Sequence, residues 1–217
     1  CSWSATSNDS WINITGGGIG NGNGTVNFTA ATNATGSSRT GTITVSGQTF
    51  TVNQSGSLLK APFDFDGDGR TDVSIFRPTP GQWWYMRSVD GGNRAFTFGQ
   101  STDNIVPADF TGDGKTDVAF WRPSTGEWYV LRSENSTFYA FPFGANGDIP
   151  VPGDYDGDGI EDAAVFRPSG AVWYVARSSG GITFQTFGAS TDIPVHGDFD
   201  GDSKADLAIF RPSDGSW

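Results

Sequence analysis

The chain is organised around a nine-residue segment that occurs four times, and its first copy reads Asp64-Phe65-Asp66-Gly67-Asp68-Gly69-Arg70-Thr71-Asp72. Carboxylates stand at segment positions 1, 3, 5 and 9, and Gly69 at position 6 permits a sharp bend. Carboxylate oxygens in this order, with a backbone carbonyl at position 7, are typical ligands of a hard cation such as Ca²⁺. The segment therefore predicts a calcium loop.

Three further copies argue against a chance match. They begin at Asp109, Asp154 and Asp198, so the starts are 45, 45 and 44 residues apart. The second copy carries Thr111 in place of the carboxylate at position 3, and we expect it to bind calcium most weakly. In the fourth copy Ser203 replaces the glycine at position 6, which predicts a strained bend.

The composition is typical of a globular β protein. Glycine accounts for 31 of the 217 residues, Trp, Phe, Val and Thr are abundant, and no helical period is visible. At this length two domains are expected. We therefore predict an all-β fold in two parts: residues 1–57, in outline a small β-sandwich, and the repeats over residues 58–217.

The net charge of −11 is explained by the four loops. Of the 24 acidic residues, 15 are loop aspartates, and the other nine stand against 13 basic residues, which leaves +4. Four bound divalent ions would bring the whole chain to about −3. The acidity therefore indicates metal coordination, and without a basic stripe no nucleic-acid partner is expected.

Cys1 is the only cysteine, so no disulfide forms within the chain, and no apolar stretch of 18 residues predicts a transmembrane segment. A chain that begins at cysteine is also compatible with lipoprotein processing, in which Cys1 would be lipidated. The alternative is that Cys1-Ser2-Trp3 belongs to the interior of a strand.

Residues 1–57 are dominated by Ser, Thr, Asn and Gly and contain one acid and one base. Strands are predicted at 11–15, 24–30, 41–45 and 48–53, with a hairpin turn at Ser46-Gly47. The segment resembles the BACON family through Cys1-Ser2-Trp3, Trp11-Ile12-Asn13-Ile14, Gly22-Asn23-Gly24-Thr25-Val26, Arg39-Thr40-Gly41-Thr42-Ile43-Thr44-Val45 and Val52-Asn53-Gln54-Ser55-Gly56. That resemblance implies an immunoglobulin-like module of bacterial surface or secreted proteins, acting as a spacer or contacting glycans.

Seven Asn-x-Ser/Thr triplets are candidate N-glycosylation sites. They begin at Asn8, Asn13, Asn23, Asn27, Asn33, Asn53 and Asn135. A segment so rich in Ser and Thr produces several such triplets by chance, so modification and chance occurrence both remain open.

Each repeat reads as four short strands over about 45 residues, the period of a propeller blade. In the third repeat the strands are predicted at 151–154, 162–168, 172–178 and 183–188, and the blades at about 61–105, 106–150, 151–194 and 195–217. The strand after each loop is apolar on both faces, as in Ala163-Ala164-Val165-Phe166, so both faces must be covered. Blades stacked in a propeller would cover them, and a linear solenoid is the alternative.

From residue 61 onward the chain resembles the FG-GAP and VCBS-type repeats of integrin α-subunits and bacterial surface proteins. The matching residues are Phe98-Gly99 with Asp103, Phe143-Gly144 with Asp148-Ile149-Pro150, Phe187-Gly188 with Asp192-Ile193-Pro194, and the Asp-rich loops. The resemblance implies one Ca²⁺ in each loop, up to four, held between two strands at the blade rim. The implied ligands are Asp64, Asp66, Asp68, Arg70 and Asp72; Asp109, Thr111, Asp113, Lys115 and Asp117; Asp154, Asp156, Asp158, Ile160 and Asp162; and Asp198, Asp200, Asp202, Lys204 and Asp206, with Arg70, Lys115, Ile160 and Lys204 acting through backbone carbonyls.

Aromatic and arginine side chains also recur once per repeat. Trp83, Trp128, Trp173 and Trp217, with Trp84, Tyr129 and Tyr174 beside the first three, are predicted to pack between blades, although they could stack on sugars. Arg77, Arg122, Arg167 and Arg211 each precede a proline and are predicted to pair with loop aspartates of a neighbouring repeat. His196, the only histidine, is expected on a surface loop.

These features predict a non-catalytic protein, secreted or on the cell surface, that mediates adhesion or carbohydrate binding, with a glycan or a surface protein as its ligand. One alternative is a subunit of an extracellular filament or surface layer, because the fourth repeat stops at Trp217, two strands short, and neighbouring subunits or further chain could complete it. Another is an accessory region of a larger secreted carbohydrate-active enzyme. One Cys and one His make a catalytic triad hard to build.

Overall fold

The computed structural model describes residues 1–31, 33, 38–54 and 61–217, and the predicted boundary at residues 57–58 lies outside them. The chain divides into two compact units, Cys1–Leu59 and Lys60–Trp217. Every regular element in the described residues is a β-strand, apart from a 3₁₀ turn at Pro168–Gly170. The all-β prediction is confirmed. Among these residues, no helix has the length and apolar character needed to cross a membrane.

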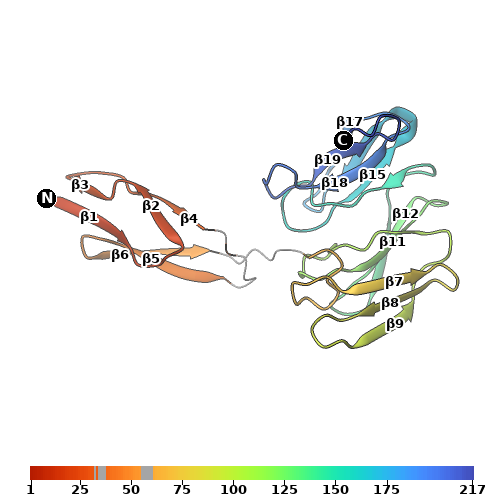
Figure 1. Ribbon diagram of the computed structural model, residues 1–217, viewed down its shortest axis with the longest axis horizontal. Helices are drawn as coiled ribbons and strands as arrows, with labels where there is room; N and C mark the ends of the chain where they lie inside the picture. Colours follow the sequence, from red (N-terminus) through yellow and green to blue (C-terminus); the bar gives the residue numbers. More distant parts are fainter. Residues whose placement is uncertain (32, 34–37, 55–60) are drawn as a thin grey trace. The chain divides into compact units, whose positions relative to one another are not determined.

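The first unit is a sandwich of two antiparallel sheets (Figure 1). One sheet has the strand order β3-β1-β5-β6, with bounds Ile19–Asn21, Ser2–Ser7, Arg39–Val45 and Gln48–Gln54. The other pairs β2 (Ile12–Gly16) with β4 (Asn27–Ala30). The sheets meet where Ile12 lies against Gly41, and Ile12 and Ile43 are 3% and 2% exposed.

The turn between β5 and β6 is the one the sequence predicts. Ser46 and Gly47 have φ values of 47° and 81°, the left-handed pair of a two-residue hairpin. Strand β1 was not predicted in full, because its polar Ser and Thr residues mask the alternation of Trp3 and Ala5 toward the interior.

The structure separates the candidate glycosylation sites. Asn33 is 2% exposed, which disfavours a glycan on this side chain in the folded protein. The other six asparagines are exposed and stay predictions: Asn8, Asn13, Asn23, Asn27, Asn53 and Asn135. Cys1 is exposed and unpaired.

The second unit consists of antiparallel sheets that follow one another in chain order (Figure 1). The sheet of the first blade contains β7 (Val73–Arg77), β8 (Gln82–Met86) and β9 (Asn93–Thr97). The second contains β10 (Asn104–Ile105), β11 (Val118–Arg122), β12 (Glu127–Leu131) and β13 (Phe138–Pro142). The third contains β14 (Ile149–Pro150), β15 (Ala163–Arg167), β16 (Val172–Ala176) and β17 (Ile182–Thr186), and the fourth pairs β18 (Ile193–Gly197) with β19 (Asp206–Phe210).

In the second, third and fourth blades the Asp-rich loop joins the first two strands, because the strand before the loop pairs with the strand after it. In the first blade no strand is described before the loop. Asn104 of β10 stands opposite Trp121 of β11, and Ile149 of β14 stands opposite Phe166 of β15. The first strand of the third blade is Ile149–Pro150, so the strand predicted at 151–154 is wrong. Within that segment only Gly153 makes an isolated bridge, to Asp162. The register therefore places the loop at one end of the hairpin and the start of its first strand at the other.

Neighbouring blades pack through clusters that each contain one of the recurring tryptophans. Trp83 packs with Val118 of the next blade, Trp128 with Ala163 and Val165, and Trp173 with Ile209. These three tryptophans are 2% exposed or less, which confirms the predicted packing between blades. Trp217, the fourth of the series, is 78% exposed and does not follow it.

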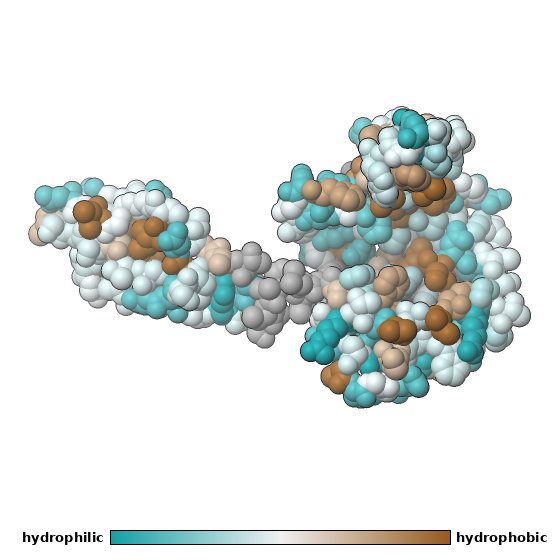
Figure 2. Space-filling view, in the orientation of Figure 1, coloured by the Kyte–Doolittle hydropathy of each residue, from teal (hydrophilic) through white to brown (hydrophobic). Residues whose placement is uncertain are grey.

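The prediction that the strand after each loop is covered on both faces holds for the second and third blades and is wrong for the first, and in the fourth only Ile209 of β19 is buried. Residues 118–121 of β11 and 163–166 of β15 are buried. In β7, Val73 and Ile75 are 68% and 51% exposed, because no described blade lies on that face. Figure 2 shows apolar side chains at the surface over this first blade.

Candidate metal centres

The Asp-rich loops depend on residues that accept a left-handed backbone. In the first loop Gly67 and Gly69 both have φ of 83°, and the third loop repeats this at Gly157 and Gly159, with 80° and 87°. Glycine adopts this conformation without steric cost. Ser203 in the fourth loop has φ of 71°, which confirms the strained bend expected there.

The first aspartate of each loop folds the loop around its own carboxylate. Asp64 accepts hydrogen bonds from the amides of Gly67 at 2.7 Å and Gly69 at 2.8 Å, one on each oxygen. Asp109, Asp154 and Asp198 accept the equivalent pairs of amides in their own loops. The position-1 carboxylates are therefore held in one orientation.

The last aspartate of the first three loops is buried and fastens the loop to the rest of its blade. Asp72, Asp117 and Asp162 are 2% exposed or less. Each accepts a hydrogen bond from the amide of loop position 2 at 2.9 Å. Each accepts another from the amide of a serine that follows the second strand after the loop. These serine contacts measure 2.6 Å for Ser88, 2.8 Å for Ser133 and 2.7 Å for Ser178.

The serines are part of the site, and sequence reasoning missed them. Each follows an arginine of a second series, Arg87, Arg132 and Arg177, so an Arg-Ser pair repeated at the period of the loops was the available signal. In blades two and three the serine hydroxyl also donates to the position-5 carboxylate, from Ser133 to Asp113 and from Ser178 to Asp158.

Burial makes the position-9 carboxylates of the second and third loops costly to ionise. Burial raises the pKa of Asp117 to about 6, although the Ser133 amide opposes the shift. Burial likewise raises the pKa of Asp162. A buried carboxylate is stabilised by a cation or by hydrogen bonds, and the partners recorded for these two are N–H and O–H groups, which supply no full positive charge.

Three of the loops bring their carboxylates at positions 1, 3 and 9 together. In each, one oxygen from every member lies within 4.8 Å of the others. The groups are Asp64, Asp66 and Asp72; Asp154, Asp156 and Asp162; and Asp198, Asp200 and Asp206. Such a set of carboxylates could hold a metal ion.

The position-5 aspartates lie outside these groups. Asp68, Asp158 and Asp202 each accept the amide of position 7 in their own loop, at 2.9, 2.8 and 2.9 Å. This local turn directs one carboxylate oxygen back to the backbone. The structure thus gathers three of the four predicted acidic side chains in each of these loops. The carbonyls of Arg70, Lys115, Ile160 and Lys204 stay predicted ligands.

The second loop has the same shape with one carboxylate fewer. Thr111 at position 3 places its hydroxyl 3.4 Å from the Asp117 carboxylate. Asp113 at position 5 accepts the Lys115 amide at 2.8 Å, as its equivalents do. Two carboxylates, Asp109 and Asp117, are left where the other loops have three.

The donor atoms fit a hard divalent cation. The grouped side chains offer only carboxylate oxygens, without the nitrogen or sulfur ligands that transition metals favour. Three carboxylates per group also exceed the charge of one divalent ion, so an ion would relieve their mutual repulsion. The residues therefore fit Ca²⁺.

The recurring arginines do not pair with loop aspartates, so that prediction is wrong. Arg122 binds Asp103 through two hydrogen bonds of 2.9 and 2.8 Å. Arg167 and Arg211 bind Asp148 and Asp192 in the same way. The β10–β11 register explains the error, because Arg122 and Asp103 lie at the end of the hairpin opposite to the loop.

Arg77 in the first blade instead donates to Gln82 at 3.3 Å. Three of these arginines also cover the aromatic rings named above as alternative sugar-stacking residues: Arg77 lies over Trp84, Arg122 over Tyr129 and Arg167 over Tyr174, at 5.0, 4.7 and 4.7 Å from the ring centres.

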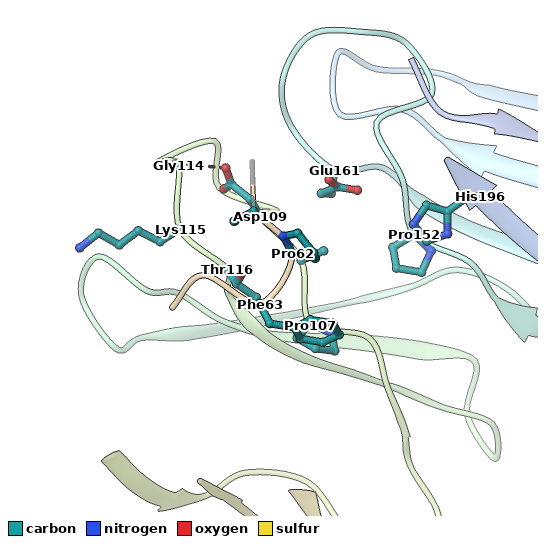
Figure 3. A pocket seen from close by; sticks show the side chains of 12 residues that line it. Pro62, Phe63, Pro107, Asp109, Gly114, Lys115, Thr116, Pro152, Glu161 and His196 are labelled. Atoms are coloured by element: carbon teal, nitrogen blue, oxygen red, sulfur yellow. Dashed lines mark hydrogen bonds between the residues drawn. The ribbon is translucent and has the colours of Figure 1, made fainter. Parts of the chain in front are cut away.

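A hollow of about 370 Å³ lies beside the second and third Asp-rich loops and the segments that lead into the loops (Figure 3). Pro62, Pro107, Pro152 and His196 line it from equivalent positions of the four repeats, together with Glu161. His196 lies on strand β18 and not on a loop, because it pairs with Leu207 of β19. Lys115 extends away from the other labelled side chains in Figure 3.

Comparison with known families identifies both units. Residues 2–55 match the model of the BACON family, a domain to which a binding role is ascribed. Residues 64–120 and 109–165 match the model of FG-GAP-like repeats. No curated protein and no solved structure matches the chain. The chain thus contains a BACON domain followed by FG-GAP-like repeats.

Proposed function

We propose that this is a non-catalytic extracellular protein whose repeats are stabilised by Ca²⁺ and which mediates adhesion or carbohydrate binding. The observation that carries the proposal is the recurrence of one carboxylate arrangement, at positions 1, 3 and 9, in three of the four loops, those of the first, third and fourth blades. BACON domains and FG-GAP-like repeats are typical of extracellular binding proteins, and this agrees with such a role.

The proposed part played by calcium is to staple each blade at one end. An ion at positions 1, 3 and 9 would neutralise the buried carboxylate that joins the loop to the serine after the third strand. Loops of this kind in extracellular modules bind calcium with dissociation constants of about 0.1–1 mM. Occupancy would therefore require a calcium-rich exterior.

The calcium experiment is a thermal melt of the full chain. With calcium at about ten times the dissociation constant, each occupied loop should stabilise the fold by about 1.4 kcal/mol, and a chelator should remove that gain. Mg²⁺ at the same concentration is the control, because its smaller octahedral shell fits a carboxylate loop less well. A melting temperature that does not respond to calcium would contradict the proposal.

The ligand is tested separately, with a glycan array and with adhesion to immobilised surface proteins, each at millimolar calcium and again with a chelator. Binding that depends on calcium would support the proposed role. Absence of any glycan signal at millimolar calcium would remove carbohydrate binding and leave a protein ligand.

The exposed face of the first blade favours a second candidate function, a subunit of an extracellular filament or surface layer. Val73 and Ile75 are exposed at positions where the inner blades bury their residues against a neighbour. A blade from another copy of the chain could cover them. Light scattering and negative-stain microscopy test this, and a protein that stays monomeric at high concentration would exclude it.

A further inference from the structure

The Asp-rich loops of neighbouring blades are bonded to one another. The amide of loop position 8 donates to the carbonyl of position 1 in the preceding loop, from Thr116 to Asp64 at 2.6 Å. The same bond joins Glu161 to Asp109 at 2.9 Å and Ala205 to Asp154 at 2.7 Å. Four loops thus form a chain of three contacts.

Side chains at loop position 7 reinforce these contacts. Lys115 lies against Gly67 of the preceding loop, so close that a Cβ added to this glycine would stand 2.8 Å from the lysine. Ile160 lies in the same way against Gly112, and Lys204 against Gly157, at 2.8 and 3.0 Å. Glycine at position 4 therefore serves two purposes: it adopts the left-handed backbone of the bend, and it leaves room for the side chain from the next loop.

From these contacts we propose that calcium ions in adjacent loops bind with positive coupling, transmitted by residues 7 and 8 of each loop. The inference rests on the proposed calcium function. The residue at loop position 7 is a predicted ligand of its own loop and also packs on the preceding loop. The amide of position 8 donates to the backbone carbonyl of position 1 in the preceding loop, and the carboxylate of that position-1 residue is a predicted ligand there. An ion that orders one loop therefore orders part of its neighbour's site, so the second ion has less entropy to lose.

Electrostatics acts in the opposite direction. An empty loop is negative and attracts calcium to its neighbour, and filling it weakens that attraction. Salt screens this long-range effect but leaves the hydrogen bonds and packing contacts between loops in place. The positive coupling should therefore be larger at about 1 M salt than at physiological ionic strength, where the Debye length is about 8 Å.

The decisive experiment titrates the full chain with calcium and follows the amide NMR signals of position 6, which report each loop separately: Gly69, Gly114, Gly159 and Ser203. The variant Asp156→Asn removes one charge from the third loop with little change of shape. We expect the second and fourth loops to need at least about fivefold more calcium, and the first loop to change less. Unchanged midpoints in the second and fourth loops would overturn the coupling.

A failure of the calcium function itself looks different, because no loop of the unmodified protein would then respond to calcium. If all four loops respond and remain independent of one another, only the coupling is wrong.

A side-chain variant tests the route of the coupling. Ile160→Ala removes the packing on Gly112 and keeps the Ile160 carbonyl. In this background, Asp156→Asn should shift the second loop at most half as much as before, while the fourth loop, contacted through Lys204, should shift as before. Arg70→Ala is the matched control, because no Asp-rich loop precedes it in the described chain. Equal behaviour of the Ile160 and Arg70 variants would contradict transmission through position 7.

Discussion

Blades one and three share three equivalent strands, which lie in very different surroundings. Val73 and Ile75 of β7 are 68% and 51% exposed, whereas Ala163 and Val165, at the same positions of β15, are 4% and 0% exposed. The residues are similarly apolar in both blades, so the difference comes from the neighbouring blade. A blade of this kind is therefore an incomplete unit that buries its face only in an array.

The two blades also differ at the end opposite to the loop. Arg167 of the third blade holds Asp148 through two bonds, and the Asp148 side chain is 2% exposed. Arg77 of the first blade bonds to Gln82, and Leu58 occupies the sequence position that corresponds to Asp148. The third blade is thus held at the loop by its position-9 aspartate and at the opposite end by the Arg167–Asp148 pair. In the described residues, the first blade has only the contacts at its loop.

The largest effect is expected from the tryptophans between blades. Trp128→Ala should lower the free energy of unfolding by about 3–5 kcal/mol, because a fully buried ring leaves a large cavity. Trp217→Ala, at the equivalent position, should cost less than about 1 kcal/mol, since Trp217 is 78% exposed. Denaturant unfolding measures both, and equal losses would mean that the exposed ring is covered in solution.

The next effect concerns the arginine pairs. Arg167→Met removes the guanidinium that lies over Tyr174 and leaves the Asp148 carboxylate without its cation, at an expected cost of about 2 kcal/mol. Arg77→Met should cost about 0.5 kcal/mol or less, because its partner is a neutral amide. Thermal or denaturant unfolding compares the two variants. A loss at Arg77 as large as that at Arg167 would show that the first blade has a buried acidic partner after all.

Two identical residues give the most direct comparison of inner and outer positions. Val118 of β11 is 5% exposed and Val73 of β7 is 68% exposed. Val118→Ala should destabilise the protein by about 1.5 kcal/mol and Val73→Ala by less than about 0.5 kcal/mol. If Val73→Ala costs as much as Val118→Ala under conditions in which the chain associates, the first blade is being covered by a partner.

The smallest effect is expected at the second loop, which can be made like the third. Thr111→Asp adds the carboxylate that Asp156 supplies in the third loop and should raise the calcium affinity of the second loop about tenfold, or about 1.4 kcal/mol. The amide signal of Gly114 in a calcium titration measures this change. A second loop whose midpoint does not move would show that position 3 does not contact the ion.

The sequence predicted what depends on local geometry. Loop spacing, the glycines at positions 4 and 6 and the hairpin turn at Ser46-Gly47 are set by backbone conformations of neighbouring residues. The packing between blades could be predicted for three of the four recurring tryptophans, because an aromatic residue repeated once per blade meets the same surroundings wherever another described blade packs on it. The strand alternation in residues 1–7 was missed because small polar residues carry little hydrophobic signal.

Partners far apart in the chain could not be predicted in the same way. The arginines lie 19 residues from their aspartates, and the loops lie 16 residues from the serines that cap them. Several acidic residues stood at comparable separations, so only the strand register could select among them. The sequence likewise places a carboxylate at loop position 5. Only the three-dimensional structure shows that this carboxylate accepts a hydrogen bond from the backbone amide of position 7.

By itself, the sequence determined that this chain contains repeated, glycine-shaped acidic loops on a β scaffold, since spacing and backbone freedom are local properties. Only the tertiary structure decided which apolar strands are buried, which carboxylates converge and that each loop rests on the one before it. Burial and convergence depend on what packs against a residue. In a repeat protein, equivalent residues of two repeats can have different neighbours although the sequences of the repeats are alike.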